Sequence, residues 1–83
     1  MIKEEIWRVP MQRAVSFFRG QEDVTEESAN VFQCRSCRIV LTEMKPAGTG
    51  IWATKRVKVS MEGSDPDVEE IYHRFVLQFL SLG

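Results

Sequence analysis

The last third of the chain shows the clearest spacing of hydrophobic residues. Apolar side chains recur there every three or four positions, which is typical of a helix with one broad buried face. Asp65 can cap free backbone N–H groups and Pro66 suits the first helical position, so both mark the start of the helix. We therefore expect a helix over residues 66–81 that packs on a sheet. The face expected to be buried consists of Val68, Ile71, Tyr72, Phe75, Val76, Phe79 and Leu80.

The segments before this helix alternate between apolar and polar residues. Between residues 37 and 44, and again between residues 51 and 61, apolar side chains occupy every second position over most of the segment. This two-residue period is typical of strands with one buried and one solvated face. The join K-P-A-G-T-G contains the Pro and Gly that a tight turn requires. Residues 37–61 are therefore predicted to form a β-hairpin.

The N-terminal third gives a weaker pattern. The segment E-I-W-R-V-P fits a short strand that Pro10 ends. Residues 11–19 fit a helix that Gly20 ends, but their Val and Phe side chains also suit a second strand. We favour the helix. Residues 21–30 are polar and acidic, so we expect a loop or one or two helical turns there.

The order strand, helix, acidic connection, strand, strand, helix predicts an α+β fold. We expect a two-layer sandwich in which the C-terminal helix and one N-terminal helix cover one face of a small antiparallel sheet. The 83 residues are predicted to form a single domain, residues 1–83. A chain this short buries only roughly 60 to 65% of its unfolded surface, although 43% of its residues are hydrophobic. We therefore expect a homodimer that forms through the open sheet face or an edge strand.

Charge is unevenly distributed along the chain although the formal net charge is only −1. Between residues 31 and 61 there are six Lys and Arg side chains and one acid, Glu43. The flanking residues 22–27 and 62–70 are acidic. Such a pattern either steers a partner or keeps neighbouring segments in register.

Part of the basic segment forms a candidate nucleic-acid site. A flat basic surface with an aromatic ring can contact phosphates and stack on unpaired bases. Single-stranded nucleic acid, RNA included, is therefore a possible ligand. The alternative is that these cations keep a solvent-facing strand soluble and protect its edge. The candidate residues on the polar face of the hairpin are Arg38, Trp52, Arg56 and Lys58.

Residues 57–71, V-K-V-S-M-E-G-S-D-P-D-V-E-E-I, resemble the last strand and helix of KH domains. The resemblance implies a fold class of α+β type. The G-x-x-G loop with which that family clamps the nucleic-acid backbone is absent, because Gly20 is followed by Gln21, Glu22 and Asp23. The resemblance therefore assigns no binding residues to this chain.

The two cysteines form a C-x-x-C pair, Cys34 and Cys37, within V-F-Q-C-R-S-C-R-I-V-L. This stretch resembles the first cysteine pair of the Yippee group of zinc-knuckle proteins, which complete a tetrahedral site with a second C-x-x-C. No further cysteine is present here, so a zinc site would need Cys34 and Cys37 from each of two chains. In an extended strand the two thiols point to opposite faces, so we favour inert buried thiols over zinc or redox chemistry.

The sequence offers little that suggests catalysis. The single histidine, His73, falls on the polar side of the C-terminal helix and is expected to be solvated. The G-T-G at residues 48–50 lacks the lysine and following helix of a phosphate-binding loop. We therefore expect a non-enzymatic interaction module with no cofactor and no metal. No secretory signal or membrane span is recognisable, which predicts a cytoplasmic protein, or a nuclear one in a eukaryote, with no membrane partner.

Overall fold

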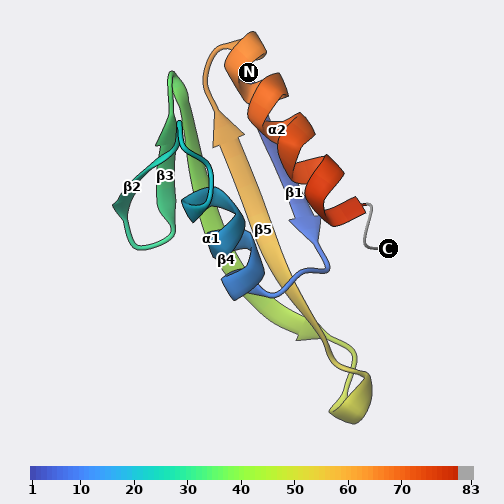
Figure 1. Cartoon of the computed structure of the whole chain (residues 1–83). Coiled ribbons are helices and arrows are strands. Elements are labelled where there is room, and N and C mark those ends of the chain that lie inside the picture. Colours follow the sequence, from blue (N-terminus) through green and yellow to red (C-terminus); the bar gives the residue numbers. More distant parts are fainter. Residues whose placement is uncertain (81–83) are drawn as a thin grey trace.

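Five antiparallel strands form one sheet in the order β1-β5-β4-β3-β2. The structure is a computed structural model that describes residues 1–80, apart from the side chain of Trp52. The predicted α+β fold is confirmed. The sheet has more strands than the predicted hairpin and N-terminal strand supply. The elements are β1 (Ile2–Trp7), α1 (Met11–Arg19), β2 (Thr25–Ser28), β3 (Val31–Cys34), β4 (Cys37–Ala47), the 3-10 turn η1 (Gly50–Trp52), β5 (Thr54–Glu62) and α2 (Asp65–Leu80) (Figure 1).

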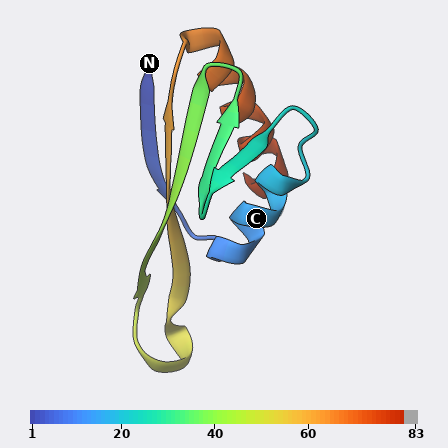
Figure 2. The same cartoon turned by 90° about the vertical axis from the view of Figure 1, so that its left-hand side faces the viewer.

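Both helices lie on the same side of the sheet and leave its other face open (Figure 2). The predicted helix over residues 66–81 is observed as α2, and residue 81 lies outside the described residues. Its buried side chains are Val68, Ile71 and Phe75. The prediction was wrong for Leu80, which is 66% exposed because it lies at the end of the helix and off its central stripe. The rest of the predicted face is partly buried: Tyr72, Val76 and Phe79.

Strands β4 and β5 form the predicted hairpin. Ile39 lies opposite Met61 and Leu41 opposite Val59, and all four side chains are buried under the helices. The turn comes later than predicted, because β4 continues to Ala47 before η1 begins. The far end of the hairpin extends beyond the helices as an arm, residues 44–56 (Figure 1).

The favoured interpretation of residues 11–19 as a helix is confirmed by α1, which Pro10 precedes. Its residues Ala14, Val15 and Phe18 are buried. The Phe18 ring stacks on that of Phe75 with centroids 5.6 Å apart, which joins the two helices. Tertiary packing thus decides a segment whose local sequence suits both helix and strand.

The expectation of a loop or helical turns over residues 21–30 was wrong for the middle of this segment, while residues 21–24 and 29–30 do form turns or irregular structure. Residues Thr25–Ser28 form β2, which pairs with β3 and has all four residues exposed. Asn30 has φ of 64°, a left-handed conformation that lets the chain reverse directly into β3. A strand with no buried face has no alternation of apolar and polar residues. The formation of β2 therefore depends on its hydrogen bonds with β3, and the local sequence does not predict it.

Candidate interaction site at the β1 edge

Among the described strands, β1 forms one edge of the sheet and pairs with β5 alone. Its two isoleucines, Ile2 and Ile6, point to the open face and are 69% and 51% exposed. They are opposite Glu62 and Lys58 of β5. An edge strand with exposed apolar residues offers both backbone hydrogen bonds and hydrophobic surface to another strand.

The pairing with β5 determines which backbone groups of β1 face outward. The amino group of Met1 donates to the Gly63 carbonyl at 2.8 Å, and the Gly63 N–H donates to the Met1 carbonyl at 3.1 Å. Hydrogen-bonded and non-hydrogen-bonded pairs alternate along an antiparallel ladder. The backbone groups of Lys3 and Glu5 therefore point toward β5, and those of Ile2, Glu4 and Ile6 point away from it.

On the side of β1 that faces the helices, Lys3 and Glu5 both contact Tyr72. The Lys3 ammonium lies 4.2 Å from the centroid of the Tyr72 ring, and the Tyr72 hydroxyl donates to Glu5 Oε1 at 2.7 Å. The hydrogen bond to Glu5, with partial burial, raises the pKa of Tyr72 above its usual value. Tyr72 therefore orients a cation and an anion that stand two residues apart on this edge.

The opposite edge of the sheet is built differently. Strand β2 is four residues long and its pairing with β3 is interrupted by a register shift between Glu26 and Ser28. Arg19 donates two hydrogen bonds to the Glu26 carboxylate, at 2.8 and 2.9 Å. Short length, irregular pairing and charge protect an edge from further strands. Of the two edges, β1 is the one suited to pairing.

Some of the residues predicted to bind nucleic acid already have partners within the chain. Arg38, Arg56 and Lys58 do lie on that face, whereas the Trp52 side chain is outside the described part of the chain. Acidic side chains share the surface, because Glu62 lies opposite Arg38 and Glu4 Oε1 is 3.9 Å from Lys58 Nζ.

Arg56 is further occupied by the backbone. Its guanidinium donates to the Lys45 carbonyl at 2.8 and 3.1 Å, which fixes the side chain across the arm. The open face is therefore a mixed surface of cations, acids and apolar residues and does not form a uniform basic patch.

Cys34 and Cys37 lie directly opposite one another across the turn between β3 and β4. The expectation that they point to opposite faces was wrong, because the chain reverses at Arg35, whose φ is 54°. Both are free thiols, and both are buried in the core, at 2% and 0% exposure. Burial raises the pKa of Cys37 to about 11 and raises that of Cys34 as well. Neither thiol is accessible at the surface of the chain.

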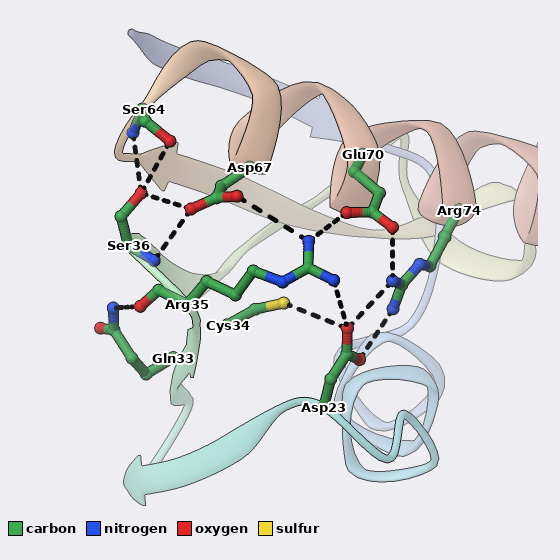
Figure 3. Close-up of polar contacts among 9 residues, drawn as sticks. All are labelled: Asp23, Gln33, Cys34, Arg35, Ser36, Ser64, Asp67, Glu70 and Arg74. Atoms are coloured by element: carbon green, nitrogen blue, oxygen red, sulfur yellow. Dashed lines mark hydrogen bonds and ion pairs between the residues drawn. The ribbon is translucent and has the colours of Figure 1, made fainter.

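Five charged residues, which we call the polar clamp, fasten the β3–β4 turn and the loop between α1 and β2 to α2 (Figure 3). They are Asp23, Arg35, Asp67, Glu70 and Arg74. Arg74 donates to both oxygens of Asp23, at 2.8 and 3.0 Å, and to Glu70 at 3.0 Å. Arg35 pairs with Glu70, and its guanidinium is 3.8 Å from Asp23 and from Asp67. The hydrogen bonds from Arg74 lower the pKa of Asp23 to about 2.

The polar clamp gives a structural role to part of the uneven charge distribution. Its acids come from the two acidic flanks and Arg35 comes from the basic segment between them. The charges therefore hold segments that are distant in sequence in register, the second of the two predicted roles.

The described residues give no sign of a metal centre. His73 is exposed on α2, as predicted. Among residues 1–80, no three His, Cys, Asp or Glu side chains are grouped so that they could hold a metal ion. No helix in this part of the chain is both long and apolar enough to cross a bilayer.

The chain matches no protein family model, and it has no significant similarity to any curated protein. The resemblances to the Yippee group and to KH domains are thus limited to the short segments 31–41 and 57–71. The candidate site consequently depends on the geometry of this chain alone. Sequence reasoning missed Ile2, Lys3, Glu5 and Tyr72; the alternation of Ile2, Glu4 and Ile6 was the available signal, but it does not distinguish an edge strand from an inner one.

Proposed function

We propose that this protein is a small non-enzymatic interaction module that homodimerises through the β1 edge. The observation that supports this is the exposure of Ile2 and Ile6 on a strand that, within residues 1–80, has no neighbouring strand on its outer side. Burying an isoleucine that is half to two-thirds exposed contributes roughly 1 to 2 kcal/mol. New backbone hydrogen bonds at the edge would add specificity.

Sedimentation velocity over a range from nanomolar to high micromolar concentration tests the proposal. We expect a concentration-dependent shift from monomer to dimer. Ile6→Lys should keep the protein monomeric, because a lysine at this position opposes edge pairing. Ile51→Lys is the matched control, since Ile51 is 92% exposed at the tip of the arm, far from β1 in the fold (Figure 1). A wild-type protein that stays monomeric throughout would refute the proposal.

Binding of single-stranded nucleic acid to the open face is the second candidate function. The observation in its favour is that Arg38, Arg56 and Lys58 share this face, as the alternation of the strands predicted. Fluorescence anisotropy with a mixed-sequence oligonucleotide should then show affinity that falls as salt rises. Arg38→Gln should weaken binding, whereas Lys55→Gln, on the other face of β5, should have little effect. Absent or salt-independent binding would exclude this function.

A further inference from the structure

We infer one specific register for the dimer, and this inference rests on the proposed function. Two copies of β1 pair antiparallel about a two-fold axis normal to the sheet that passes through Glu4. Ile2 then lies opposite the partner's Ile6 on the open face. Lys3 lies opposite the partner's Glu5 on the helix face, and Glu4 lies opposite the partner's Glu4 on the axis.

The backbone of β1 restricts the register to a few choices. A two-fold axis normal to the sheet keeps the open face of both copies on the same side, so opposed residues must face the same way. The outward N–H and C=O groups belong to Ile2, Glu4 and Ile6. These residues must therefore form the hydrogen-bonded pairs of the new ladder. The inferred register uses all three and makes about six backbone hydrogen bonds.

The side chains select among the remaining registers. A shift by two residues in one direction would place Lys3 against the partner's Lys3 and Ile2 against the partner's Glu4. A shift in the other direction would place Glu5 against the partner's Glu5 and Ile6 against the partner's Glu4. Directly opposed like charges destabilise a strand pair, whereas opposite charges and apolar pairs stabilise it. Among these registers, the inferred one alone pairs apolar with apolar residues and lysine with glutamate.

Neighbouring residues already support this arrangement. The two Glu4 carboxylates would meet on the axis, and each has the Lys58 ammonium of its own chain 3.9 Å away to offset the repulsion. Tyr72 holds both Lys3 and Glu5 at the edge of the helix face. The two charged pairs across the dimer would therefore form between side chains that are already ordered. The product is one continuous sheet that spans both chains.

Charge exchange tests the register. Lys3→Glu and Glu5→Lys should each weaken homodimerisation by roughly tenfold, because both symmetric pairs become pairs of like charge. A mixture of the two variants should form a heterodimer in which every such pair is again complementary. The double variant Lys3→Glu/Glu5→Lys should form a tighter homodimer than either single variant, although it lacks the two contacts with Tyr72. Circular dichroism on each variant checks that the loss of a Tyr72 contact has not unfolded the chain.

A cysteine at the two-fold axis gives a second, independent readout. In the inferred register the Cα atoms of residue 4 in the two chains are about 5.5 Å apart, within disulfide range. Glu4→Cys should therefore form a covalent dimer with oxidised glutathione. Ile6→Cys is the control, because the two copies of residue 6 would be about 14 Å apart. The native thiols are buried and do not compete.

The outcomes separate the register from the proposed function. A wild-type dimer whose Lys3→Glu and Glu5→Lys variants fail to form a heterodimer, or that cross-links at residue 6 and not at residue 4, would overturn the register and leave the dimer intact. A wild-type protein that is monomeric at every concentration would overturn both. Mixed-variant heterodimers together with cross-linking at residue 4 establish the register.

Discussion

Cys34 and Cys37 are cross-strand partners on either side of a two-residue turn, and both side chains enter the core. Cys34 Sγ is 3.7 Å from the Asp23 carboxylate, which can accept its weak hydrogen bond. A zinc ion shared between two chains would require both thiols to leave this buried position. The two cysteines thus pack in the core, and the polar clamp holds the β3–β4 turn between them against α2.

The first prediction concerns the reactivity of these thiols. At pH 8 Cys37 should react with iodoacetamide at least roughly a hundredfold more slowly in the folded protein than in denaturant, because its pKa of about 11 leaves little thiolate. Mass spectrometry of timed samples measures this rate. Protein purified without chelator should contain no stoichiometric zinc. Fast labelling, or one zinc per two chains in metal analysis, would contradict the buried arrangement.

The second prediction concerns two phenylalanines of α2. Phe75 is fully buried, and its ring centroid lies 5.1 Å from that of Trp7 and 4.6 Å from that of Phe79. Phe75→Ala should lower the free energy of unfolding by roughly 3 to 5 kcal/mol, because it leaves a cavity among aromatic rings. Phe79 is only partly buried, so Phe79→Ala should cost roughly 1 to 2 kcal/mol. Urea denaturation measures both, and equal losses would contradict the difference in burial.

The third prediction concerns the close contact of Gly63 with the β3–β4 turn. A Cβ atom at this position would lie 2.6 Å from the Ser36 carbonyl oxygen and 2.8 Å from the Cys37 Cα. Gly63→Ala should therefore destabilise the fold by roughly 1 to 3 kcal/mol. Gly20→Ala is the control, because Gly20 has φ of −79° and its nearest neighbour would be 3.4 Å away. A similar melting temperature for the two variants would show that the turn can move aside.

The fourth prediction concerns the pH dependence of the polar clamp. Arg74 lowers the pKa of Asp23 from 3.8 to about 2 in the folded protein. A lowered folded-state pKa contributes stability above pH 3.8 that is lost as the pH falls toward 2. The stability advantage of the wild type over Asp23→Asn should thus be full at pH 7 and shrink as the pH falls from about 4 through about 2. Because Asp23 is partly exposed, we expect an advantage below about 1 kcal/mol.

Urea midpoints at pH 7, 4 and 2.5 test this prediction, with Glu69→Gln as a control. Glu69 is exposed on α2 and is not one of the five residues of the polar clamp. An advantage that is unchanged between pH 7 and 2.5 would mean that Asp23 stabilises the fold without its charge.

The candidate site could be predicted only in part from the sequence. Alternation along β4 and β5 correctly put Arg38, Arg56 and Lys58 on one face. It could not show that Glu4 joins them, because that follows from the register of β1 against β5, whose paired residues are fifty to sixty positions apart in the chain. It also could not show that Ile2 and Ile6 face an unpaired edge, since the same alternation occurs in a strand inside a sheet.

Elements with a strong and local periodicity can be recognised in the amino-acid sequence without the structure. The three- and four-residue spacing in α2 and the two-residue spacing in β4 and β5 each reflect one apolar face along a regular backbone, so they can be recognised without a partner. Three other features follow from contacts between distant segments: α1 in place of a competing strand, β2 without any buried face, and Cys34 beside Cys37 in the core. These features depend on hydrogen bonds and packing between segments that are apart in the chain, and their energy is not encoded in local spacing.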